Sequence, residues 1–101
     1  MANADPAVLT KPEVAIKEPP LFRVVYLNDN TTTVEFVIET LIDYFNYTAE
    51  TAIYITQDIH EKGSAVVAVL PFEIAEQRGI EVTLAARTQN YPLQVKIEPD
   101  A

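Results

Sequence analysis

The sequence contains no cysteine, one histidine and only two glycines. Without cysteine, one chain can form neither a disulfide framework nor a thiolate zinc cluster, and it offers no thiol nucleophile. Gly63 and Gly79 are too few for a glycine-rich loop that brings backbone amides up to phosphates. The sequence therefore excludes disulfide or thiolate-zinc sites and thiol catalysis within one chain, and nucleotide binding is not expected.

Positive charge is also scarce, because 7 Lys and Arg face 15 Asp and Glu, which gives a net charge of −8. Such a chain repels a nucleic-acid backbone and favours cationic partners. The apolar runs are too short to cross a bilayer, and the N-terminus lacks a basic region followed by an apolar one. We therefore expect neither nucleic acid nor a membrane as partner, and no signal that directs the chain out of the cytoplasm.

The 101 residues are 49% hydrophobic, which is typical of one globular domain with at most a tail. Residues 1–20 hold four of the seven prolines and few bulky apolar side chains. This composition predicts a mobile, Pro-rich N-terminal tail over residues 1–20 and a folded domain over residues 21–101.

The first half of the folded region predicts a strand and two helices. Residues 21–27 are rich in β-branched and aromatic side chains and end at a turn-forming segment. Thr32 and Glu35 have capping-box spacing, which predicts a helix from about Thr33 to Tyr47. A second helix is expected from an N-cap at Thr48 to residue 62, closed by a left-handed residue at position 63.

The second half predicts a strand, a helix and a strand. The continuous apolar run 65–70 indicates a strand buried on both faces and central in its sheet. Pro71 ends that strand and begins a helix with Ala75, Gly79, Val82 and Ala86 on one face. Residues 93–97 alternate as in a half-buried strand. The whole order predicts a small α+β domain with helices covering one face of a sheet.

The single histidine, His60, is expected near the end of the second helix, one turn after Thr56. By default it is a partly buried structural residue or a cation at the helix C-terminus, and the polar segment 28–30 is by default a turn. Taken together, His60 and the segment 28–30 would supply several hydrogen-bond acceptors at the entrance of a shallow apolar pocket. That arrangement is suited to an ammonium group with its three donors.

An enzymatic function finds little support in the same residues. Ser64 is the only serine, and no Gly-x-Ser-x-Gly motif surrounds it. Asp58 and Glu61 flank His60, but neighbouring helical residues point to different faces. We therefore expect no catalytic residue, no metal and no cofactor.

Several segments resemble the ClpS adaptor family, in the right order and without large gaps. They are residues 22–30 (FRVVYLNDN), 34–38 (VEFVI), 60–66 (HEKGSAV) and 73–76 (EIAE). The resemblance covers roughly residues 21–98. It implies a three-stranded antiparallel sheet with three helices on one face, in the order β-α-α-β-α-β. It also implies an adaptor that binds proteins with a large hydrophobic first residue and delivers them to a Clp ATPase.

The resemblance also assigns residues to each role. Contacts to the substrate α-amino group and first peptide unit fall on Asn28, Asp29, Asn30, Thr32 and His60. The wall of the side-chain pocket falls on Val34, Val37, Thr56, Ile59 and Leu93, which are ordinary core residues by default. Docking on the N-terminal domain of a ClpA-type or ClpC-type ATPase falls on Glu73 and Arg78. The tail corresponds to an extension that the ATPase engages. The composition of the chain suits bacterial cytoplasm and plastid stroma equally.

The chain departs from the family pattern at four positions. Asn30 stands where a second Asp is frequent, and Thr33 where Pro is frequent. Val34 and Thr56 stand where the family commonly has Met at the rim and in the wall of the pocket. Shorter side chains change pocket volume and polarity, so we hypothesise an altered preference that admits β-branched or polar first residues.

Three alternatives to such an adaptor remain. One is a plain interaction module that uses the sheet edge or the acidic third helix, including one that modulates a Clp ATPase without recognising N-termini. Another is a small hydrolase that relies on His60. A third is a ClpS-like domain that serves a ubiquitin ligase, although such domains belong to much longer chains.

Overall fold

The structure, a computed structural model, describes residues 19–101. Its elements are β2 (Leu21–Leu27), α2 (Val34–Phe45), α3 (Ala49–Lys62), β3 (Ser64–Pro71), α4 (Phe72–Thr88) and β4 (Gln94–Pro99). The predicted order of strands and helices is confirmed. The predicted tail falls almost entirely on residues 1–18, which lie outside the described residues.

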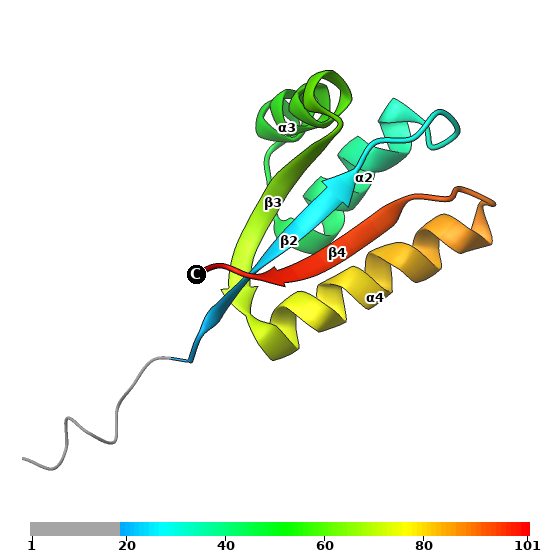
Figure 1. Cartoon of the computed structure of the whole chain (residues 1–101). Coiled ribbons are helices and arrows are strands. Elements are labelled where there is room, and N and C mark those ends of the chain that lie inside the picture. The colour runs from blue at the N-terminus through cyan, green and yellow to red at the C-terminus, as the bar shows by residue number, and fades with distance from the viewer. Residues whose placement is uncertain (1–18) are drawn as a thin grey trace, which may run out of the picture.

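The three strands form one antiparallel sheet in the order β3-β2-β4, with the helices on one face (Figure 1). The prediction that the strand at 65–70 is central was therefore wrong, because β2 is the central strand and β3 lies at an edge. Burial of β3 on both faces was wrong too, since Val66 and Val69 are exposed. These two valines pair with Val25 and Arg23 of β2, on the sheet face opposite the core.

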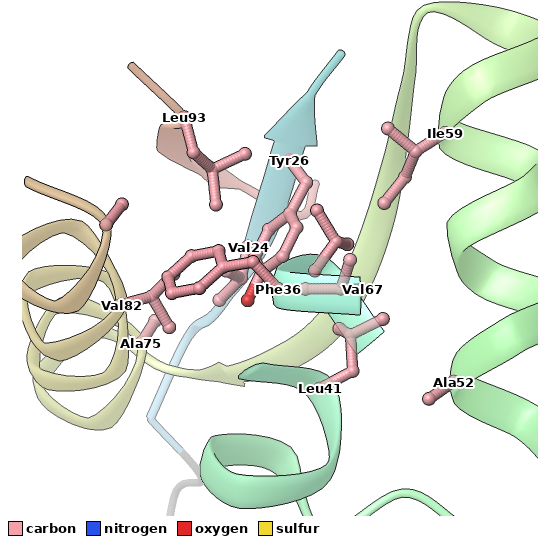
Figure 2. Close-up of a cluster of buried hydrophobic side chains, with 12 residues drawn as sticks. Val24, Tyr26, Phe36, Leu41, Ala52, Ile59, Val67, Ala75, Val82 and Leu93 are labelled. Carbon is pink, nitrogen blue, oxygen red and sulfur yellow. The ribbon is translucent and has the colours of Figure 1, made fainter. Parts of the chain in front are cut away.

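The core lies between the sheet and the helices. Val24 and Tyr26 of β2 are fully buried and point toward the helices, where Leu41 of α2 and Val82 of α4 meet them (Figure 2). The predicted buried face of α4 is confirmed at all four positions. The hydroxyl of Tyr26 lies 2.8 Å from the Thr40 hydroxyl, so even this polar atom is paired inside the core.

The ends of α2 differ from the prediction. The N-cap is Thr33, whose hydroxyl accepts a hydrogen bond from the Phe36 amide at 3.1 Å, and not Thr32. Thr32 does not cap because its amide and hydroxyl both donate to Asp29. The helix ends at Phe45 and not at Tyr47, because Asn46 adopts a left-handed conformation with φ 61°.

The caps of α3 are confirmed. The Thr48 hydroxyl accepts from the Thr51 amide, and Gly63 closes the helix with φ 89°. The Gly63 carbonyl then accepts a hydrogen bond from the Asn28 amide at 2.9 Å. The end of α3 is thereby fastened to the loop that follows β2.

Candidate functional site

The loop between β2 and α2 is organised around the Asp29 carboxylate. Its Oδ1 accepts hydrogen bonds from the amides of Thr31 at 2.8 Å and Thr32 at 2.7 Å, and its Oδ2 accepts one from the Thr32 hydroxyl at 2.8 Å. A carboxylate has about four acceptor sites, so one site on Oδ2 remains for a further donor. Asp29 therefore both shapes the loop and keeps an acceptor for a ligand.

These contacts also keep Asp29 charged. Partial burial raises the pKa of its carboxyl, but the hydrogen bonds from Thr32 and Thr31, aided by the charge of Arg87, more than offset this effect. The net result is a pKa below the ordinary value. The loop thus presents a fixed negative charge at neutral pH.

His60 lies in the last turn of α3, beside this loop. The hydrogen bond between Asn28 and Gly63 fixes its place, because Gly63 is only three residues further along the chain. The side chain of His60 is exposed, which contradicts the default expectation of a partly buried residue, whereas its place in the last turn of α3 agrees with the alternative default of a residue at the helix C-terminus. Its imidazole is therefore open to a ligand.

The loop, the start of α2 and the end of α3 together enclose a cavity of about 250 Å³. It is lined by Asn28, Asp29, Asn30, Thr32, Val34, Val37, Thr56, Ile59 and His60. Nine of the ten residues assigned above to the substrate site thus meet at one place. The tenth, Leu93, is not among the lining residues and lies fully buried in the core.

The cavity has one polar side and one apolar side. Polar groups come from the loop after β2 and from His60, and apolar groups come from buried residues of α2 and α3. The Thr56 hydroxyl donates to the Ala52 carbonyl at 2.7 Å, so its proton is committed within the helix. Val34 stands at the rim and is 53% exposed.

A second hollow adjoins the first, and its lining includes four residues that the sequence did not assign to a site. They are Ile38 of α2 and Ile53, Gln57 and Glu61 of α3. Their helical spacing relative to Val34 and His60 was a usable signal. The sequence alone does not show, however, which face of each helix the core leaves uncovered.

The two residues assigned to ATPase docking both lie on α4 but border different hollows. Glu73 is exposed in the first turn, next to Pro19, Pro20 and Phe72. Arg78 faces the end of α2 and pairs with Glu81 at 3.2 Å. No described residue of the first cavity borders either hollow.

Two other features were sought in the described part of the chain. Residues 19–101 contain no group of three or more His, Cys, Asp or Glu side chains placed to hold a metal ion. Among the same residues, none of the helices combines the length and apolar character that crossing a membrane requires.

Comparison with known proteins places the chain in a family. The model of the ATP-dependent Clp protease adaptor protein ClpS matches residues 17–96, most of the chain. The chain belongs to the ClpS family. This family consists of adaptors of the Clp protease, and the predicted family resemblance is confirmed.

Individual ClpS proteins agree over nearly the full length. The ClpS adapter of Campylobacter jejuni is 36% identical over 95 residues, covering 94% of this chain and 99% of the relative. That of Roseobacter denitrificans is 38% identical over 98 residues, covering 97% and 87% respectively. The solved structure of Agrobacterium tumefaciens ClpS2 bound to L-phenylalaninamide is 35% identical and matches with a TM-score of 0.79, covering 82% of this chain and all of ClpS2. The predicted fold is confirmed.

Proposed function

We propose that this adaptor binds proteins through a free α-amino group and a large apolar first side chain, and delivers them to a Clp ATPase. The observation that carries this proposal is the cavity with acceptors on one side and apolar residues on the other. L-Phenylalaninamide, the ligand of the similar ClpS2, has a free α-amino group and one apolar side chain. Its chemistry matches both sides of the cavity.

The polar side is suited to an α-ammonium group. Such a group has three N–H donors and one positive charge, and it needs acceptors that converge from different directions. The free site on Asp29 Oδ2 supplies a charged acceptor, and the Asn28 side-chain carbonyl and a neutral His60 nitrogen supply two more. Hydrogen bonds to charged groups are the stronger kind, worth about 1.5–3 kcal/mol each.

The apolar side is suited to one side chain. Val37 and Ile59 are buried, and the cavity of about 250 Å³ lies below the roughly 300–1,000 Å³ typical of sites for drug-sized ligands. Burying a Phe or Leu side chain contributes about 1.5–3 kcal/mol. The proposed site therefore makes two separate tests of an N-terminus, one of charge and one of side chain.

Fluorescence anisotropy with short labelled peptides tests this function. Peptides beginning with Phe or Leu should bind with a free N-terminus and lose about tenfold or more in affinity when acetylated, because acetylation removes the charge and two donors. Equal binding of free and acetylated peptides would instead favour an interaction module that modulates the ATPase without reading N-termini.

The preference among first residues depends on the side chains at the rim and in the wall of the cavity. Because Val34 is short and exposed, we propose that β-branched first residues such as Val and Ile enter the cavity. Val34→Met restores a long flexible side chain and should lower Val and Ile binding relative to Phe. A wild-type protein that already rejects Val and Ile would contradict this assignment.

Delivery rests on other parts of the chain. We propose that Glu73 and Arg78 contact the N-terminal domain of a ClpA-type or ClpC-type ATPase, and that residues 1–20 form a separate extension from the domain at 21–101. The ATPase would engage this extension during delivery. The proposed role involves no catalysis by the chain itself, and the compartment is bacterial cytoplasm or plastid stroma.

A further inference from the structure

The second hollow, a groove of about 420 Å³, runs between the outer faces of α2 and α3. It is lined by Val34, Ile38, Ile53, Thr56, Gln57, His60 and Glu61. Val34, Thr56 and His60 also line the first cavity, so the two hollows share a border. A ligand that leaves the first cavity across this border enters the groove.

The groove is an apolar surface that the core leaves uncovered. Val34 and Ile38 are four residues apart on α2, and Ile53, Gln57 and His60 follow one stripe of α3. Val34 is 53% exposed and Ile53 is 45% exposed, so in the free protein their apolar surface stays in contact with water, which is unfavourable. An apolar side chain of a bound peptide would cover both residues.

We propose that the groove binds the side chain of the third residue of the same peptide. This inference rests on the proposed function, which places the first side chain in the first cavity. In an extended peptide, side chains one and three point to the same face, about 6.6 Å apart along the chain. The third side chain therefore reaches the neighbouring hollow, while the second points away from the surface.

Charge sets a second preference in the groove. Glu61 borders it, and the chain carries a net charge of −8. An acidic third residue is repelled there, and an apolar one replaces water on Val34 and Ile53. The groove thus extends recognition beyond the first residue and favours apolar over acidic side chains at position three.

The test is a scan of tetrapeptides by fluorescence anisotropy. Phe-Ala-Leu-Ala should bind about fivefold more tightly than Phe-Ala-Ala-Ala, as expected for a partly buried Leu side chain. Phe-Leu-Ala-Ala should gain little, and Phe-Ala-Asp-Ala should bind less tightly than the alanine peptide. No gain from Leu at position three would overturn the inference.

Variants of the protein test whether the gain from Leu at position three arises in the groove. Ile53→Ser should abolish most of the gain from Leu at position three and leave Phe-Ala-Ala-Ala unchanged, whereas Ile80→Ser, at a 53% exposed position on α4, should preserve the gain. Gln57→Lys should reverse the penalty for Asp. A Leu gain that survives Ile53→Ser rejects the groove alone, while failure of every peptide with a free N-terminus rejects the proposed function as well.

Discussion

At the scale of single residues, Asp29 holds its loop through three hydrogen bonds, and the proposed function gives it a second task, which is to accept a hydrogen bond from a ligand. Asp29→Asn keeps an oxygen for the Thr31 and Thr32 amides, and its amide group can donate to the Thr32 hydroxyl. We therefore expect the free energy of unfolding to fall by only about 0.5 kcal/mol. Affinity for Phe peptides should fall about tenfold or more, because the charged acceptor is lost.

Two further variants separate these tasks. Asp29→Ala should also lose about 1–2 kcal/mol of stability at neutral pH, as measured by urea unfolding. Since the pKa of Asp29 is lowered in the folded protein, that contribution is present above about pH 3.9 and disappears as pH falls through the lower folded value.

Asp43→Asn, on an exposed part of α2, should leave peptide binding unchanged. Full affinity in Asp29→Asn would refute the ammonium contact.

A second prediction at this scale concerns Tyr26. Because the Thr40 hydroxyl donates to the Val37 carbonyl, the Tyr26 hydroxyl donates to Thr40. Burial raises the pKa of Tyr26 despite this hydrogen bond. A raised folded value gives stability that is fully present below about pH 10, the unfolded value, and is lost as pH rises toward the folded value.

Tyr26→Phe should cost about 1 kcal/mol near pH 8 and flatten the alkaline decline, as measured by urea unfolding from pH 8 to 12. Tyr54→Phe is the matched control, because Tyr54 is 70% exposed. An alkaline decline of the same slope in Tyr26→Phe and wild type would show that other groups cause it.

At the scale of elements, Gly63 connects α3 to β3 and is hydrogen-bonded to the loop between β2 and α2. Its φ of 89° disfavours any side chain, although a Cβ there would meet no atom within 4 Å. Gly63→Ala should therefore cost about 1 kcal/mol through backbone strain alone, and Gly63→Asn should cost less because Asn tolerates this conformation. Urea unfolding measures both, and equal losses would point to a lost contact instead.

The elements also show what the sequence can predict. Caps and periodicity depend on local chemistry, so β2, the ends of α3 and the buried face of α4 were predictable. The place of a strand in its sheet depends on distant partners. The apolar run in β3 therefore suggested a central strand, although Val66 and Val69 lie on an open sheet face.

The candidate site shows the same limit. Asn28, Asp29 and His60 were found because acceptors of these types suit an ammonium group. The order of the segments that resemble the ClpS family indicated that these residues share one pocket. Packing alone shows that Leu93 lies away from the cavity lining and that His60 is exposed. Burial of both helices against the sheet also decides which of their faces forms the groove.

At the scale of the whole molecule, the cavity and the surface around Glu73 use different elements. The cavity belongs to the β2–α2 loop, α2 and α3, whereas Glu73 lies in the first turn of α4. This helix follows the end of β3 that lies away from α3 (Figure 1). Substrate binding and ATPase docking are therefore predicted to be separable by mutation. An adaptor needs this separation, because it must hold both partners at once.

Charge reversal at Glu73 tests the separation. Glu73 is exposed in the first turn of α4, so Glu73→Lys should change the surface without disturbing the core. Anisotropy with Phe peptides should stay as in wild type, while degradation of a Phe-initiated protein by a Clp ATPase with ClpP should fall about tenfold. Glu76→Lys, an exposed position three residues further on, makes the same charge change and should retain delivery. If both reversals slow degradation equally, net charge guides docking and the specific contact at Glu73 must be abandoned.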